Sequence, residues 1–256
     1  SDGSLIFGSE LAARDSRVVG IDLIGTEDNP ASLEHFALHM QMLAFARRAY
    51  PTLNVAVHAG ELTPALAGPE HLTHHVTQAV RVVGARRIGH ATSLLSEPAW
   101  EGLVAEMARR RIGIAMLLGS NAQILGIEGS EHPFPVCLER GVPVMLATDD
   151  QGVLRSSHTA EFMRAIAAYR LNWDQLKRLV RAGLEHAFLD GDPLWRTPGD
   201  PTRRVEACAA DVPGRGRPSP ACRLFLESSD RAREQWRLEE RLSAFEDRWA
   251  SSGDTP

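Results

Sequence analysis

Short apolar segments alternate with amphipathic segments along the first part of the chain. Five apolar segments predict buried strands, and their successive starts lie roughly 25 to 36 residues apart, the length of a βα unit. They are residues 18–25, 54–61, 87–93, 112–121 and 142–150. Between them, segments such as 31–50 and 97–111 carry apolar residues at helical spacing. Alternating strands and helices predict an α/β fold with a parallel sheet that helices cover.

Polar and small residues follow the predicted strands at positions where functional sites are built. Among them are Gly25, His58, His90 and Asp149, each at or near the carboxyl end of its strand. A (β/α)8 barrel carries its active face at these ends. An open doubly wound sheet would instead concentrate its site at one crevice, after a glycine-rich first turn that this chain lacks. We therefore predict part of a TIM-type (β/α)8 barrel, because five strands cannot close one.

The pattern changes after Asp150. Helices are predicted over 158–170 and 173–189, and the next segment, 190–222, is so rich in Pro, Gly and charged residues that it predicts a loop excursion. Residues 223–256 return to helical spacing and predict a C-terminal helix that packs on the barrel. Within the excursion, Cys208 and Cys222 either form a disulfide that closes it or remain free thiols.

Composition limits the classes of partner. With 256 residues, 43% apolar content and a net charge of −5, the chain is expected to be globular. Its charges of both signs are interspersed, so neither nucleic acid nor an anionic membrane surface is expected as a partner. No transmembrane helix and no signal peptide are predicted. A disulfide would favour a periplasmic or secreted location, and the cytoplasm is the alternative.

The strand ends also suggest a specific chemistry. If their strands are neighbours, His58, His90 and Asp149 converge, and two imidazoles with a carboxylate suit a zinc ion that keeps a position open for water. Glu61 would lie just beyond and could move a proton, as hydrolysis of a C–N bond requires. Each residue also has a structural interpretation. A strand-end histidine is often only hydrogen-bonded, Glu61 could belong to a capping box, and Asp149 with Asp150 could form a turn.

Two further groups of histidines are interpreted as structural. His71, His74 and His75 lie at helical spacing, which predicts a solvated helix beside the site. His132 precedes a proline where a loop meets a predicted helix, so a capping role is expected for it.

Four motifs together resemble the adenosine and AMP deaminase family. They are "HAGE" (58–61), "RIGHA" (87–91), "GSN" (119–121) and "LATDD" (146–150), in this order. Other segments look most like the bacterial members of the branch related to adenosine deaminase growth factors. The resemblance implies a metallo-dependent hydrolase barrel, of which residues 1–189 would form the C-terminal five βα units. It also implies zinc-dependent deamination of adenosine, or a related aminopurine nucleoside, to inosine and ammonia.

The resemblance also implies a role for each site residue. His58 and Asp149 would be zinc ligands, with Asp149 also orienting the attacking hydroxide. Glu61 would protonate the purine N1, and His90 would steer the hydroxide and stabilise charge. Asp150 would hydrogen-bond to N7.

The resemblance assigns the purine N3 to the backbone N–H of Gly25, which must approach the ring closely. This chain departs from the family at Ala91, where the family usually has glycine. In the family, a His-x-His pair on the first strand supplies two further zinc ligands. This chain contains no such pair. An N-terminal segment of the same protein is therefore expected as a partner. Two other functions stay open: a non-catalytic partial barrel that binds a nucleoside or a protein, and a deaminase of another aminated heterocycle. A homodimer also stays possible.

Overall fold

The computed structural model describes residues 2–252 and divides the chain into two compact units, Ser1–Leu179 and Val180–Pro256. The strands of the first unit are β1 (Ile21–Leu23), β2 (Val55–Ala59), β3 (Arg87–His90), β4 (Gly113–Met116) and β5 (Val144–Leu146). Its helices are α1 (Asp2–Arg14), α2 (Pro30–Ala49), α3 (His75–Gln78), α4 (Trp100–Arg110), α5 (Leu118–Ser120), α6 (Phe134–Glu139), α7 (Gln151–Leu154) and α8 (His158–Tyr169). Helix α9 (Trp173–Glu185) crosses the boundary, and α10 (Pro220–Ser228) and α11 (Asp230–Ser252) belong to the second unit.

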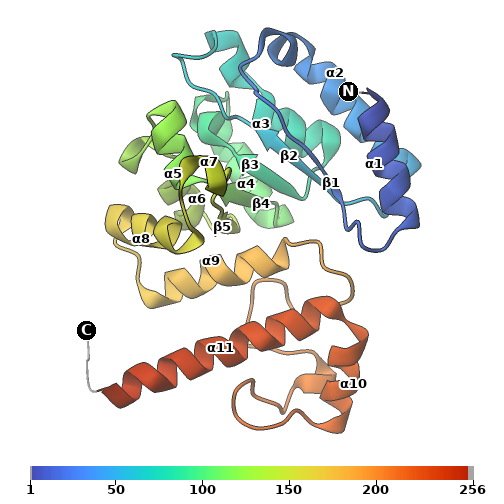
Figure 1. Cartoon of the computed structure of the whole chain (residues 1–256), viewed down its shortest axis with the longest axis vertical. Coiled ribbons are helices and arrows are strands. Elements are labelled where there is room, and N and C mark those ends of the chain that lie inside the picture. The colour runs from blue at the N-terminus through green and yellow to red at the C-terminus, as the bar shows by residue number, and fades with distance from the viewer. Residues whose placement is uncertain (1, 253–256) are drawn as a thin grey trace. The chain divides into compact units, whose positions relative to one another are not determined.

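The sheet confirms the predicted α/β architecture (Figure 1). Its five strands are parallel and lie in sequence order, β1-β2-β3-β4-β5, so each βα unit places its strand beside the preceding one. The register pairs His58 with Gly89 and Ala59 with His90 across β2 and β3. The carboxyl ends of these strands therefore lie at one edge of the sheet, as they do in a (β/α)8 barrel.

The first unit has one main apolar core, formed by the strands and the helices that pack on them. Strand side chains such as Val57, Ile88 and Ile114 are fully buried, as are Met40 of α2 and Met107 of α4. Burying an aliphatic side chain of this size contributes roughly 1.5–3 kcal/mol relative to exposure. The strands are apolar at nearly every position because both faces of a parallel sheet are covered.

Helix α2 begins where its sequence predicts. The Asn29 side chain accepts the N–H of Ala31 at 3.0 Å, and Pro30 fills the first helical position, where no intrahelical N–H bond is lost. One face of the helix then buries Phe36, Met40 and Leu43. Among the described residues, no helix is long and apolar enough to span a membrane.

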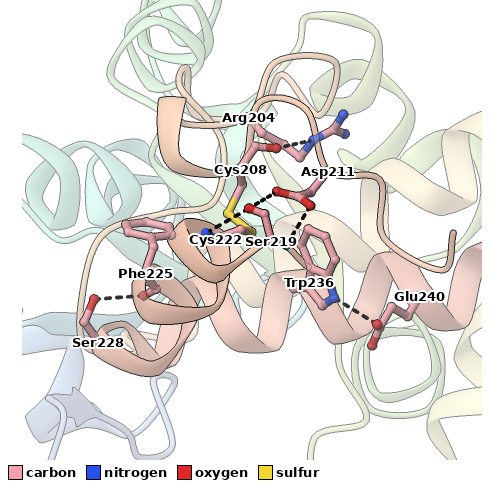
Figure 2. The surroundings of a disulfide bond; sticks show 9 residues. All are labelled: Arg204, Cys208, Asp211, Ser219, Cys222, Phe225, Ser228, Trp236 and Glu240. Atoms are coloured by element: carbon pink, nitrogen blue, oxygen red, sulfur yellow. Dashed lines mark hydrogen bonds between the residues drawn. A yellow bond between two sulfur atoms is a disulfide. The ribbon is translucent and has the colours of Figure 1, made fainter. Parts of the chain in front are cut away.

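The second unit has its own apolar core and a disulfide between Cys208 and Cys222, which confirms the bonded alternative (Figure 2). Asp211 accepts hydrogen bonds from the backbone N–H and the hydroxyl of Ser219, at 2.8 and 2.7 Å. Ser219 in turn caps α10 by accepting the N–H of Cys222. The Pro/Gly-rich segment is therefore tied down at both cysteines. The domain boundaries at 189 and 222, and the packing of 223–256 on the barrel, stay predictions.

Candidate active site

Three strand ends bring Glu61, His90 and Asp149 together. One ligand atom from each residue lies within 4.8 Å of the others, in a half-buried to buried setting. A Glu61 oxygen lies 3.5 Å from His90 Nδ1, and Asp149 Oδ2 lies 3.9 Å from His90 Nε2. Glu61 follows β2, His90 is the last residue of β3 and Asp149 follows β5, and these strands are far apart in the sequence. Of the predicted group of His58, His90 and Asp149, the structure brings His90 and Asp149 together, and Glu61 rather than His58 is the third member of this cluster.

Glu61 is held by a tight turn at the end of β2. Gly60 has φ +80°, and a Cβ there would lie 2.8 Å from a methyl group of Val76 and 2.9 Å from Ser93 Oγ. The buried Glu27 carboxylate accepts the backbone N–H groups of Gly60 and Glu61 at 2.8 and 2.6 Å. Glycine is thus required by both backbone conformation and space. The Glu27 carboxylate fixes the direction in which the chain leaves β2.

Glu27 itself is held by His75. His75 Nδ1 lies 2.5 Å from a Glu27 oxygen, and its fully buried ring stacks on Phe36 with 3.7 Å between centroids. A carboxylate only accepts hydrogen bonds, so His75 Nδ1 carries the proton. The prediction of a solvated helix is wrong for His75, because its ring lies in the interior beneath the Glu61 turn. Its spacing with His71 and His74 could not show which of the three faces inward.

His58 is oriented by Asp22 of β1. Its Nδ1 lies 3.0 Å from Asp22 Oδ1, so the proton sits on Nδ1 and the lone pair of Nε2 is left for a metal ion. Burial lowers the pKa of His58, but the hydrogen bond and charge of Asp22 outweigh it and the net shift is upward. The ring packs over Gly89, where a Cβ would lie 3.2 Å from it. The glycine of "RIGHA" therefore makes room for His58.

Asp149 is oriented by the "GSN" motif. Ser120 donates its hydroxyl to Asp149 Oδ2 at 2.5 Å. The buried Glu161 of α8 accepts the backbone N–H of Gly119 at 2.9 Å, and a Cβ on Gly119 would lie 2.3 Å from its other oxygen. Gly119 is therefore needed so that a carboxylate can fix the turn that carries Ser120.

Three residues at the site have left-handed backbone. The φ angles are +63° at His90, +56° at Ala91 and +58° at Asp149. For a residue with a side chain this conformation costs roughly 1–2 kcal/mol, and such strain concentrates at functional sites. The family's usual glycine at position 91 would avoid this cost, so Ala91 is a departure that the backbone accommodates.

The surroundings of Glu61 and His90 shift their pKa values in opposite directions. Burial, the Asp149 carboxylate and the Glu27 carboxylate together raise the pKa of Glu61 to about 7. Burial and the neighbouring His58 ring lower the pKa of His90 to about 4. Glu61 can therefore carry a proton near neutral pH, whereas His90 is a neutral imidazole.

The donor set fits a divalent cation. His58 offers Nε2 with its other nitrogen fixed by a carboxylate, as metal-binding imidazoles usually have. Asp149 and Glu61 crowd negative charge around His90, and a cation would offset this repulsion. Imidazole nitrogen with carboxylate oxygen is a ligand set that suits zinc.

Gly25 and Asp150, like His58, are predicted site residues that lie outside the cluster of Glu61, His90 and Asp149. Gly25 lines a cavity of about 220 Å³ together with Glu27, His58 and mainly apolar side chains. Asp150 is solvent-exposed and lies just before α7. The structure therefore links Gly25 to the cluster through His58, and leaves the predicted contact of Asp150 with the purine as a prediction.

Several residues that shape the site were not assigned these roles from the sequence. Asp22 had a signal, since it is a lone carboxylate between Ile21 and Leu23 in an apolar strand. Glu27 stood out only as a polar residue after that strand. Glu161 had no signal, because it lies 42 residues after the backbone group that it binds and inside an ordinary helical pattern.

Parallel βα units with imidazole and carboxylate groups at their carboxyl strand ends are typical of the class of (β/α) barrel proteins. Within it, the model of the family described as adenosine deaminase matches residues 8–194, and the chain belongs to this family. The adenosine deaminase of Salmonella schwarzengrund is 35% identical over 184 residues, which are 71% of this chain and 50% of that protein. The chain thus spans about half the length of the curated relatives it matches.

Two solved structures show the same fold. Arabidopsis ADAL complexed with GMP is 25% identical with a TM-score of 0.58, over 74% of this chain and 51% of that one. An amidohydrolase from Burkhoderia ambifaria, with bound Zn, is 20% identical with a TM-score of 0.59, over 75% of this chain and 50% of that one. Together with the sheet, they identify the first unit as the βα units of a TIM-type barrel.

Proposed function

We propose that this protein removes the amino group of adenosine, or of a related aminopurine nucleoside, by hydrolysis, giving inosine and ammonia. The observation that carries the proposal is the convergence of Glu61, His90 and Asp149 from three strand ends. Membership of the adenosine deaminase family supports the reaction type. The ADAL structure with GMP supports a purine as the ligand.

The cofactor in this proposal is a zinc ion held by His58 Nε2 and Asp149. When bound, such an ion supplies a water molecule of lowered pKa as the nucleophile. A catalytic zinc generally has three protein ligands, so the remaining ligands would come from residues outside these 256, as the family resemblance implies. The bound Zn of the amidohydrolase neighbour supports the choice of metal.

In the reaction, each residue acts on a stated atom. Glu61 gives its proton to the purine N1, which makes C6 electrophilic, and its raised pKa supports this acid role. The oxygen of water adds to C6 while Asp149, fixed by Ser120, orients it. Neutral His90 donates a hydrogen bond to the charge that develops on that oxygen. Of the two protons of the added water, one passes to the amino group, which leaves as ammonia when the C6–N bond breaks, and the other restores the proton that Glu61 gave to N1.

Two measurements test the proposal in the protein purified from its native host. Metal analysis should find one zinc per molecule, and adenosine should lose its ultraviolet absorbance as inosine forms. Zinc and nucleoside binding without turnover would instead support a non-catalytic barrel. If the protein deaminates another aminated heterocycle but not adenosine, the proposed substrate is wrong and the proposed reaction type stands.

The disulfide bears on location. Disulfides persist in oxidising compartments, and Cys208 and Cys222 are bonded in a buried setting. We propose a periplasmic or secreted protein on this basis. Fractionation of the native host that finds the protein in the cytoplasm with both thiols reduced would contradict this location.

A further inference from the structure

A continuous chain of hydrogen bonds runs from α6 to the catalytic His90. The backbone N–H of Phe134 donates to His132 Nδ1 at 3.1 Å. His132 Nε2 lies 3.0 Å from Asn121 Oδ1, and Asn121 Nδ2 lies 3.0 Å from His90 Nδ1. The three side chains are at most 1% exposed, so water does not compete for these groups. His132 precedes Pro133, the N-cap residue of α6, and its bond to the N–H of Phe134 accounts for only one side of the ring.

The first donor fixes the direction of every bond in the chain. A backbone N–H can only donate, so His132 Nδ1 must be the acceptor. Burial lowers the pKa of His132 to about 4, so the ring is neutral and its one proton sits on Nε2. That proton must be donated to the oxygen of the Asn121 amide. The NH2 of Asn121 then faces His90 and donates to Nδ1, which leaves the proton of His90 on Nε2.

One contact favours the opposite direction. A Glu61 oxygen lies 3.5 Å from His90 Nδ1 and would accept a proton placed there. Reversing the chain, however, would turn the Asn121 NH2 toward His132 Nε2 and move the proton of His132 to Nδ1, against the N–H of Phe134. The bond from the Phe134 N–H to His132 Nδ1 at 3.1 Å would be lost for one contact at 3.5 Å, which is longer than a normal hydrogen bond. A buried donor left without an acceptor destabilises the structure, so the direction set by the Phe134 N–H is favoured.

We propose that Asn121 and His132 are positioning residues that keep the proton of His90 on Nε2, the nitrogen that faces Asp149. The catalytic part of this inference rests on the proposed function. His90 Nε2 lies 3.9 Å from Asp149 Oδ2, where the attacking oxygen would be oriented. A proton on Nε2 makes His90 a hydrogen-bond donor to that oxygen. A proton on Nδ1 would aim a lone pair at the same place and oppose the developing negative charge.

The first test is the tautomer of His90 in the wild-type protein. Histidine labelled with 15N gives separate nitrogen resonances for protonated and unprotonated ring positions, and the signals of His90 and His132 are identified by their loss in H90Q and H132F. We expect the proton on Nε2 in both residues. A wild-type spectrum with the proton of His90 on Nδ1 overturns the proposal.

The second test reverses the donor. Asn121→Asp has nearly the same shape but only accepts hydrogen bonds when ionised. It should move the proton of His90 to Nδ1 and leave His132 unchanged, because His132 already donates to this position. The spectrum is recorded at a pH at which the 13C shift of the new carboxyl group shows it to be ionised. An unchanged His90 tautomer under that condition overturns the proposal.

The matched control is Asn172→Asp. Asn172 is exposed, and its side-chain oxygen accepts the N–H of Gln175, a bond that aspartate keeps. The His90 signals and the activity should both stay as in the wild type. A change of His90 in this variant would show that added charge alone moves the tautomer, which overturns the assignment to Asn121.

The activity measurement separates this inference from the proposed function. In the zinc-loaded protein, Asn121→Asp should lower kcat by about a hundredfold or more, as removal of a transition-state hydrogen-bond donor does, with KM little changed. If the wild type does not deaminate adenosine, the proposed function fails whatever the spectra show. If the tautomer reverses as expected but kcat is unchanged, the positioning role is wrong while the deaminase assignment stands.

Discussion

Replacing Gly60 by alanine should destabilise the protein by about 1–4.5 kcal/mol. At φ +80° a side chain costs roughly 1–2 kcal/mol, and alanine recovers about 0.4–1 kcal/mol of this by restricting the unfolded chain. The new Cβ would also lie 2.8 Å from a Val76 methyl group and 2.9 Å from Ser93 Oγ, and overpacking of this kind adds about 1–3 kcal/mol. Conformation and crowding therefore act in the same direction.

Gly126→Ala is the matched control for this prediction. Gly126 lies in the same unit with φ +68°, but a Cβ there would have nothing within 4 Å. It should cost only the net conformational part, about 1 kcal/mol. Urea unfolding of both variants gives the two differences in free energy. A loss in Gly60→Ala no larger than in Gly126→Ala would refute the claim that space at the Glu61 turn is tight.

Activity gives the same prediction a second measurement. Relief of the overlap at Gly60 must move Val76, Ser93 or the turn itself, and the turn carries Glu61. We expect kcat in Gly60→Ala to fall further than the fraction of unfolded protein explains, whereas Gly126→Ala should keep its kcat. Equal kcat in the two folded variants would show that the turn absorbs the methyl group without moving the carboxyl group.

Four further changes have defined outcomes. Glu61→Gln should leave zinc and nucleoside binding nearly intact while turnover falls by at least about a hundredfold; an equal loss of binding would make Glu61 structural. Glu27→Gln should destabilise by about 1–3 kcal/mol in urea unfolding, since an amide cannot accept all the bonds that Glu27 accepts, whereas the same change at exposed Glu101 should stay within about 0.5 kcal/mol. Replacing both Cys208 and Cys222 by serine should lower the free energy of unfolding by up to about 3 kcal/mol, because the bond closes a loop with a sequence separation of 14. An equal free energy of unfolding for the wild-type protein with and without reductant would contradict this. The 256-residue chain alone should bind zinc weakly and not deaminate adenosine, because it offers only His58 and Asp149 as predicted ligands; one tightly bound zinc with turnover would show this ligand assignment to be wrong.

The sheet could be predicted from the sequence because its signal is local. Each strand is an apolar run bounded by polar or small residues, and all five are present, although the ladders are shorter, as in Ile21–Leu23 within 18–25. Helix α1 was not predicted, since Ile6 and Phe7 are 64% and 69% exposed and mark no consistent buried face. A helix that buries little leaves little pattern to detect.

The reactive residues could be predicted, but their supports could not. His58, His90 and Asp149 stand at strand ends, and a parallel sheet brings such ends together whatever the loops do. The pairing of Asp22 with His58 depends on the register of β1 and β2, and a shift by one residue would turn Asp22 to the other face. The bond of Glu161 to Gly119 depends on where α8 packs, which the periodicity of α8 does not contain.

The buried carboxylates explain how strained site residues hold their positions. Left-handed backbone at His90, Ala91 and Asp149 would relax if the flanking turns were free to move. Glu27 fixes the turn after β2, and the Gly60 carbonyl of that turn accepts the N–H of Ser93, just beyond His90 and Ala91. Glu161 fixes the turn after β4 by accepting the N–H of Gly119, and Ser120 of that turn donates to Asp149. Both carboxylates are buried, where an unmade bond is costly. Neither carboxylate belongs to the Glu61, His90 and Asp149 cluster, so each can serve as a fixed anchor while the protons of the cluster move. Rigid placement of the reacting groups therefore comes from carboxylates outside the reaction, and a substitution there should change the geometry of catalysis without removing any reacting group.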